Sequence, residues 1–148
     1  MADNIFQQLI QQQAIEALLI RYAHACDRRD WSLLETVFAE HIEVNYGGEF
    51  KVAGRDAVIN MIQSMLGGCG PTQHLLGNFT IAVNGLQAGS SCYVRAVHEG
   101  LAEQRGQYYE VWAEYTDTLQ WVYDRWLIVY REMKVHNEVG SRAVLAPA

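Results

Sequence analysis

Two residues far apart in the sequence, Asp27 and His74, are of the types that together make a general base. Histidine is the side chain best suited to moving protons near neutral pH, and a carboxylate on one ring nitrogen fixes its tautomer and stabilises the imidazolium. If the two meet in the fold, they could remove a proton from a carbon made acidic by a neighbouring carbonyl, ring or leaving group. Periodicity alone does not place them in contact. In a second interpretation Asp27 pairs with Arg28 or Arg29 at a solvated helix end, and the imidazole is a hydrogen-bonded core histidine.

Asp27 stands at the end of a predicted helix over residues 4–27. Five residues recur in this segment at spacings of three and four and form one apolar stripe: Ile15, Leu18, Leu19, Tyr22 and Cys26. This stripe must pack over the sheet whose first long strand begins with His74.

Two shorter helices and a hairpin are predicted before the first long strand. Asp30 is a suitable N-cap for a helix over residues 31–38, and residues 54–66 fit another helix. Residues 42–46 and 49–53 alternate in polarity around a glycine turn, which predicts a hairpin.

The second half of the chain is rich in β-forming residues. Four long runs separated by short turns predict a meander: 73–84, 88–104, 107–122 and 125–136. Helices followed by a meander predict one α+β domain over residues 1–148, with the helices packed on a strongly curved mixed or antiparallel sheet. We expect the last segment, GSRAVLAPA, to be a loose extension or an oligomer contact.

Alternation along the second and third long strands identifies one face that is small, apolar and lined with tyrosines. In order along the chain its members are Cys92, Val94, Ala96, His98, Tyr109, Val111, Ala113 and Tyr115. Such a concave face predicts an apolar pocket for a small hydrophobic molecule. His98, Tyr46 or Tyr115 could donate a hydrogen bond there to an oxygen that gains charge or leaves.

Composition and charge narrow the function classes. The 148 residues include 11 Lys and Arg against 17 Asp and Glu, a formal net charge of −6, which disfavours nucleic acid and anionic membranes as partners. We expect neither a signal peptide nor a membrane span. Three cysteines without C-x-x-C spacing indicate reduced thiols and a cytoplasmic protein. Histidine spacing predicts no metal site, and we expect no cofactor.

Four stretches of the sequence resemble a known family: IEALLIRYAHACDRRDWSLLETVFAEHIEV, GRDAVINMI, TQHLLGNFTI and SSCYVRAVHEG. They are similar to the SnoaL-like family of the nuclear-transport-factor-2-like superfamily, in the branch of scytalone dehydratase, bile acid 7α-dehydratase and hexachlorocyclohexane dehydrochlorinase. The resemblance spans roughly residues 8 to 136. It implies a cone-shaped α+β fold around a deep apolar pocket.

The resemblance also implies site residues. The family's Asp–His dyad falls at Asp27 and His74, and a second histidine falls at His98. Of the two tyrosines of scytalone dehydratase, one matches Tyr46 and the other falls at Cys26. A late-strand arginine matches Arg125 or Arg131. We expect the substrate to contact a wider set: Tyr22, Cys26, Asn78, Val94, Tyr109, Val111, Tyr115 and Arg125.

Three functional hypotheses follow. The first is a cofactor-independent lyase of the dehydratase type that acts on a small cyclic or aromatic compound. The second is an isomerase or polyketide cyclase with the same dyad. The third is a non-catalytic module for binding or assembly, such as the small subunit of a ring-hydroxylating dioxygenase. An outward sheet face rich in Trp and Tyr predicts a homodimer or homotrimer.

Overall fold

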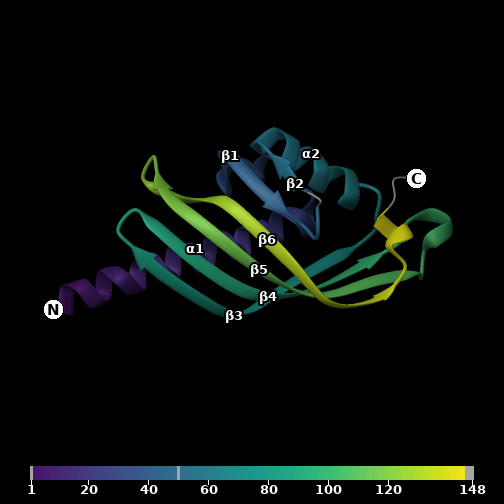
Figure 1. The fold of residues 1–148 in the computed structure, drawn as a ribbon. Coiled ribbons are helices and arrows are strands. Elements are labelled where there is room, and N and C mark those ends of the chain that lie inside the picture. Colours follow the sequence, from purple (N-terminus) through teal and green to yellow (C-terminus); the bar gives the residue numbers. More distant parts are fainter. Residues whose placement is uncertain (1, 50, 146–148) are drawn as a thin grey trace.

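The computed structural model describes residues 2–49 and 51–145, in which two α-helices pack on a six-stranded mixed sheet that is not closed (Figure 1). The sheet order is β2-β1-β6-β5-β4-β3. Neighbours pair antiparallel except β1 and β6, which pair parallel. The predicted α+β fold is confirmed. Its strands are β1 (Phe38–Asn45), β2 (Lys51–Ala53), β3 (Thr72–Asn84), β4 (Gln87–Glu99), β5 (Tyr108–Val122) and β6 (Arg125–Gly140).

The long first helix, α1 (Ala2–Arg28), packs against β3, and its first turns extend beyond the strands (Figure 1). All five members of the predicted apolar stripe are buried. Their burial fixes the last turn of α1, which carries Asp27, beside the beginning of β3.

The end of α1 is a Schellman motif. The Asp30 N–H donates to the Ala25 carbonyl at 3.0 Å, and the Arg29 N–H donates to the Cys26 carbonyl at 3.3 Å. Arg29 has a φ of 58°, in the left-handed region where this motif usually has glycine. The chain therefore keeps a large side chain at a position where glycine is conformationally easier.

The prediction of a helix over residues 31–38 is wrong. The structure has a short 3₁₀ helix, Ser32–Thr36, and β1 begins at Phe38. The Val37 carbonyl already accepts from the Ile128 N–H at 2.9 Å, so pairing with β6 replaces a second helical turn. The predicted hairpin is formed by the end of β1 and by β2, and the predicted third helix is α2 (Arg55–Leu66). Phe50 lies outside the described residues.

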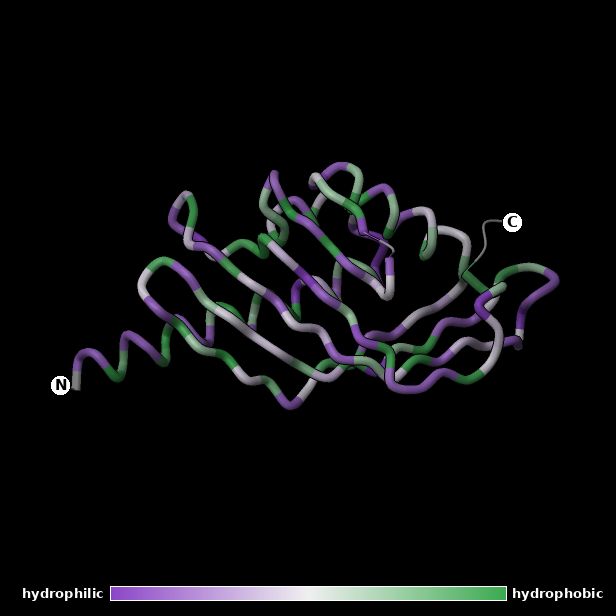
Figure 2. The backbone as a smooth tube through the Cα atoms, in the orientation of Figure 1, coloured by the Kyte–Doolittle hydropathy of each residue, from purple (hydrophilic) through white to green (hydrophobic). Residues whose placement is uncertain are grey.

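The four predicted long strands are present, with shifted ends. The run predicted to end at residue 104 ends at Glu99, because a 3₁₀ helix over Ala102–Gln104 follows Gly100. In contrast, β6 continues past residue 136 to Gly140, since its polar end still pairs with β5. Figure 2 shows hydrophilic and hydrophobic residues alternating along these strands.

Irregular pairing bends the sheet. The pairing of β3 with β4 shifts between Gly77 and Thr80, where the extra residue is on β3. The pairing of β5 with β6 shifts at Trp112/Ala113 and at Thr118/Leu119, where the extra residue is on β6. Such bulges bend a strand and increase its twist. Asn78, inside the first of them, has a φ of 54°. The bent strands curve around the space that α2 and the C-terminal segment cover (Figure 1).

The segment after β6 is not the loose extension that we expected. It forms a 3₁₀ helix, Arg142–Leu145, in which Val144 is fully buried. The chain turns into it at Gly140, whose φ is 88°, and a Cβ there would collide with the Tyr108 carbonyl oxygen. Residues 146–148 of the predicted extension lie outside the described residues. Within residues 2–49 and 51–145, no helix is both long and apolar enough to span a bilayer.

Candidate active site

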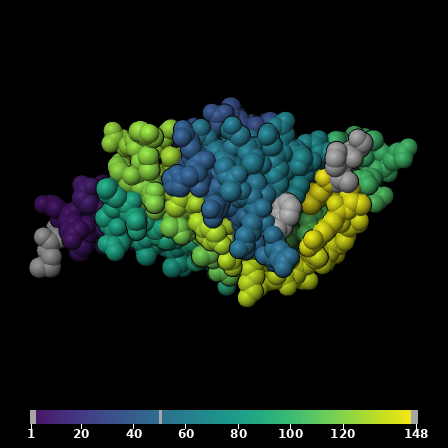
Figure 3. Space-filling view, turned by 45° about the horizontal axis from the view of Figure 1, so that its top comes forward, coloured from purple at the N-terminus to yellow at the C-terminus, as the bar shows by residue number. Residues whose placement is uncertain are grey.

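A cavity of about 480 Å³ opens between the concave face of the sheet, α2 and the C-terminal segment. Figure 3 shows the surface hollowed between the C-terminal segment, in yellow, and the blue-teal segment that includes α2. This volume is in the range of small-molecule pockets. The lining residues are mostly apolar, with histidine and tyrosine side chains among them, and include Tyr22, Tyr46, Ile62, Met65, His74, Val94, His98, Tyr109, Val111, Tyr115, Met133, Arg142 and Leu145.

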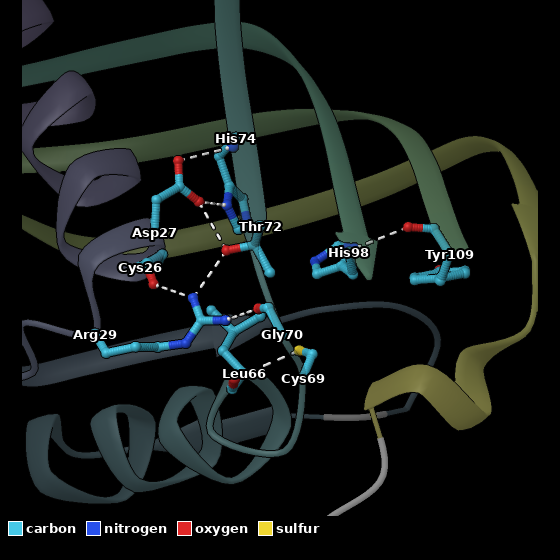
Figure 4. A network of polar contacts seen from close by, with 10 residues as sticks. All are labelled: Cys26, Asp27, Arg29, Leu66, Cys69, Gly70, Thr72, His74, His98 and Tyr109. Carbon is cyan, nitrogen blue, oxygen red and sulfur yellow. Dashed lines mark hydrogen bonds and ion pairs between the residues drawn. The ribbon is translucent and has the colours of Figure 1, made fainter. Parts of the chain in front are cut away.

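Asp27 and His74 meet at the wall of this cavity (Figure 4). Nδ1 of His74 lies 2.7 Å from Oδ1 of Asp27. The two side chains are 6% (His74) and 19% (Asp27) exposed. A carboxylate accepts hydrogen bonds, so Nδ1 carries the proton and Nε2 of the neutral ring keeps its lone pair. Because the ring lines the cavity, Nε2 is the nitrogen left for a ligand.

The Asp27 carboxylate is held at both oxygens. Oδ2 accepts the backbone N–H of His74 at 3.0 Å, and Oδ1 also accepts the Thr72 hydroxyl at 3.0 Å. Burial raises the pKa of Asp27. Its hydrogen bonds from His74, the charge of His74 and the hydrogen bond from Thr72 together have the larger effect, so the pKa lies below its usual value. Asp27 is therefore ionised at neutral pH, as a partner that stabilises an imidazolium must be.

The hydrogen bond of His98 to the backbone leaves it an acceptor on the other ring nitrogen, whereas the sequence interpretation considered it as a donor. Its Nδ1 lies 3.1 Å from the Tyr109 carbonyl oxygen, and a carbonyl only accepts, so the proton is on Nδ1. Burial lowers the pKa of His98 to about 4, and the hydrogen bond to Tyr109 only partly opposes this effect. At neutral pH its Nε2 therefore has a lone pair and no proton. Its ring stands 5.5 Å from that of His74, nearly perpendicular to it.

Three neighbouring tyrosine side chains lie together in the lining of the cavity. The hydroxyl oxygens of Tyr22 and Tyr46 are 3.4 Å apart, and the rings of Tyr22 and Tyr115 pack edge to face with centroids 5.8 Å apart. Burial raises the pKa of all three hydroxyls. They remain protonated at neutral pH and are therefore available as hydrogen-bond donors.

A buried cation lies against these rings. The Arg131 guanidinium carbon is 4.3 Å from the ring centroid of Tyr22 and 4.1 Å from that of Tyr115. Its Nε and Nη2 donate to the two oxygens of Asp117 at 2.7 and 2.8 Å, and both side chains are sealed from solvent. Arg131 Nη1 is buried without a hydrogen-bond partner. The charge of Arg131 lowers the pKa of the tyrosine hydroxyls, against the larger effect of their burial.

Three side chains form a polar cluster at the C-terminal side of the cavity. The Tyr109 hydroxyl donates to Glu138 Oε2 at 2.8 Å, and Arg142 donates to the same oxygen through Nε and Nη2. Hydrogen bonds from Tyr109 and then Arg142 lower the pKa of Glu138. This cluster ties the C-terminal segment to β5 and β6.

Most of the predicted site residues come together, and three do not line the cavity. Arg125 is exposed beside the Tyr123-Asp124 turn, where the β5–β6 hairpin carries it into solvent. Asn78 is exposed at the bulge of β3, where its left-handed conformation serves the bend. Cys26 is fully buried in the core under the cavity, and burial raises the pKa of its thiol to about 12.

Sequence reasoning missed Asp117 as well as the contributions of Met65 and Arg142. Asp117 had a visible signal, because it continues the inward alternation of Tyr115 and is the one charged residue among the inward positions 109, 111, 113, 115, 117 and 119 of β5. Of the two candidate arginines, the register pairs Arg131, and not Arg125, with this aspartate.

A second hollow, of about 490 Å³, lies over side chains that alternate with those of the cavity. It is lined by Leu75, Tyr93, Arg95 and Trp112, among others, on the outward face. The Asp27–His74 pair does not face this hollow, so the inner cavity is the candidate site. Within the described part of the chain, no group of three or more His, Cys, Asp or Glu residues could hold a metal ion.

Comparison with known proteins gives the same fold. The model of the SnoaL-like domain matches residues 7–132. The uncharacterized protein Rv2910c of Mycobacterium tuberculosis is 30% identical over 120 residues, which cover 79% of this chain and 80% of that protein.

Two solved structures superpose on most of the chain. One, from Novosphingobium aromaticivorans, is provisionally named a scytalone dehydratase. It has a TM-score of 0.85 and 26% sequence identity, and the match covers 99% of this chain and 96% of that chain. A type 2 hexachlorocyclohexane dehydrochlorinase has a TM-score of 0.80 and 16% identity over 90% of each chain.

Proposed function

The chain belongs to the SnoaL-like domain family, and from this premise we propose that it is a cofactor-independent lyase of the dehydratase type. Its substrate would be a small hydrophobic cyclic or aromatic compound. The observation that carries the proposal is the 2.7 Å contact between Asp27 and Nδ1 of His74, which leaves Nε2 available on a ring that lines an apolar cavity. The names of the two structural neighbours, a dehydratase and a dehydrochlorinase, support elimination chemistry.

His74 would act as the general base. Its Nε2 takes a proton from a carbon next to a carbonyl, and Asp27 stabilises the imidazolium that results. The apolar cavity strengthens this charge pairing, because little water competes with it. Removal of the proton leaves an enolate, whose negative oxygen needs hydrogen-bond donors.

The tyrosine hydroxyls would supply these donors. Tyr22 and Tyr46 remain protonated, and their oxygens lie close enough for both to approach one enolate oxygen. Arg131 lies against the Tyr22 and Tyr115 rings, so its positive charge favours a developing negative charge nearby. Arg131, and not Arg125, would therefore be the arginine that stabilises the negative charge of the enolate.

His98 would orient the leaving group. Its Nε2 accepts a hydrogen bond from a substrate hydroxyl one carbon beyond the enolate carbon. The electron pair of the broken C–H bond forms the new C=C bond, and the C–O bond breaks. The departing hydroxide takes the proton back from the His74 imidazolium and leaves as water, so the reaction is balanced without an added reagent.

A panel of cyclic β-hydroxy ketones tests this function. The enzyme would be incubated with each compound in D₂O, with enone formation followed by ultraviolet absorbance and deuterium in the recovered ketone by mass spectrometry. We expect enone from at least one ketone, and loss of this activity in His74→Ala. Deuterium uptake without loss of water would favour the isomerase or cyclase alternative. Tight binding of a ketone without either change would favour a binding module.

A further inference from the structure

We infer that Arg29 and Thr72 are positioning residues of the Asp27–His74 pair. Arg29 orients the hydroxyl of Thr72, and this hydroxyl fixes the carboxylate to which His74 donates (Figure 4). One interpretation of the sequence places Arg29 at a solvated helix end, whereas the structure gives its side chain three acceptors. The inference deepens the proposed function and rests on it for its catalytic consequence, but its geometry stands on contacts of its own.

The direction of each hydrogen bond in this relay is fixed by chemistry. Nη1 of Arg29 lies 2.8 Å from Oγ1 of Thr72, and a guanidinium only donates. The single hydroxyl proton of Thr72 is therefore free to point at Oδ1 of Asp27, 3.0 Å away. Thr72 and His74 are two residues apart on β3, so both side chains leave the same face of the strand toward this carboxylate.

Arg29 also sets the distance between the helix and the strand. Its guanidinium donates to the Cys26 carbonyl at 2.7 Å and to the Gly70 carbonyl at 2.6 Å, which lie in α1 and in the loop before β3. Together with Thr72, these acceptors come from two stretches of chain, the end of α1 and residues 70–72. One rigid fork of donors can hold them in a single geometry, which a lysine ammonium cannot reproduce.

The backbone of Arg29 points to the same need for its side chain. Its φ of 58° is the left-handed conformation at which a Schellman motif usually has glycine. Strained positions of this kind persist when the surrounding structure requires them and gather at functional sites. A glycine at this position would lack the guanidinium that donates to Thr72.

The consequence concerns the tautomer of His74. With both oxygens of Asp27 held, the carboxylate cannot turn away, and the ring proton stays on Nδ1. If Asp27 turned, the proton could move to Nε2, and the ring would then present a donor to the cavity in place of a base. The relay therefore keeps the basic nitrogen on the cavity side.

The experiment reads the His74 tautomer directly from its two ring-nitrogen chemical shifts, in nitrogen-15-labelled full-length protein at neutral pH. Thr72→Val keeps the shape of the side chain and removes the hydroxyl, while Thr72→Ser keeps the hydroxyl. Arg29→Gly keeps the left-handed backbone and removes the guanidinium. Asp27→Asn is the reference for a broken pair.

We expect the Nδ1–H form in the wild type and in Thr72→Ser, and a mixture of both tautomers in Thr72→Val and Arg29→Gly. An Nδ1–H form that persists unchanged in those two variants overturns the inference, even if they are less stable, and leaves the proposed function intact. A wild type without the Nδ1–H form overturns both. Tautomers that change as expected, with no elimination from any ketone, would count against the proposed function alone.

Discussion

Two acid–base pairs on the inner face of the sheet have the same shortest distance and different surroundings. Asp27 and His74 meet at 2.7 Å, and so do Asp117 and Arg131. The first pair lies at the seam between α1 and β3, and its histidine also lines the cavity. The second lies between β5 and β6, with side chains that are 1% (Asp117) and 0% (Arg131) exposed.

The difference shows that a short distance does not define a function. A pair can move a proton to or from a ligand only if one partner can exchange a proton and also lines the cavity, and His74 is an imidazole in the lining. Arginine does not lose its proton in proteins, so the sealed pair can act only through its fixed charge. Substitutions in these pairs, at His98 and in an exposed pair should separate these roles.

The largest effect should come from His74→Ala. Removal of a general base typically costs about 10²–10⁴-fold in rate, so kcat on a ketone substrate should fall by that factor. The fold should remain, because the ring faces a cavity. Enone formation and circular dichroism measure the two quantities together. A variant that keeps more than about a tenth of the wild-type rate would remove His74 from the mechanism.

Replacing one member of the sealed Asp117–Arg131 pair should mainly lower the stability of the protein. Asp117→Ala leaves the Arg131 charge buried without its partner, and we expect the free energy of unfolding to fall by about 3–5 kcal/mol in urea titrations. The double replacement Asp117→Leu with Arg131→Met removes both charges and should recover much of this loss. Its activity should stay low, since the charge beside the tyrosines is gone. A single variant as stable as the wild type would show that the pair is not sealed in solution.

His98 should make the protein sensitive to acid. Its pKa of about 4 in the fold lies below the ordinary value of about 6.5, so between these values the unfolded chain binds a proton that the folded chain does not. Stability should therefore fall as pH decreases from about 6.5 to 4, by about 3 kcal/mol. His98→Gln should show a smaller fall over the same range in urea titrations at each pH. Equal falls in both proteins would mean that His98 is not held neutral.

The smallest effect is expected for a third pair, on the outside of the sheet. His136 and Glu114 approach within 3.4 Å, but their side chains are 46% and 33% exposed. Exposed pairs contribute less than about 1 kcal/mol, so His136→Ala should change neither the rate nor the unfolding free energy beyond about 0.5 kcal/mol. This variant is the matched control for His74→Ala, and a large loss of rate in it would undermine the distinction drawn above.

Periodicity was sufficient for the parts of the fold that repeat. Apolar spacing in α1 and alternation in β4 and β5 identified the buried faces, because burial of one face imposes the period of the element. The same alternation placed Val94, His98 and Tyr109 on the cavity side. The family resemblance then directed attention to Asp27 and His74, whose contact the structure supplies.

The remaining features depend on contacts between distant segments. The β1 strand begins at Phe38, before the predicted start, because it pairs with β6. No local sequence pattern indicates a parallel neighbour. The C-terminal segment covers the cavity because Val144 finds a buried site. Arg29 looked like a solvated cation because its acceptors include Thr72 and Gly70, which lie 43 and 41 residues further along the chain.

The place of the C-terminal segment also bears on how the protein should be produced for assays. Arg142 and Leu145 line the cavity, whereas the first turns of α1 extend away from it at the other end of the molecule (Figure 1). A C-terminal purification tag would follow Leu145, a lining residue, within a few positions in the sequence, and we expect it to obstruct ligand entry. A tag placed before α1 avoids that region, so binding constants from the two fusions should be compared before any failure to bind is accepted.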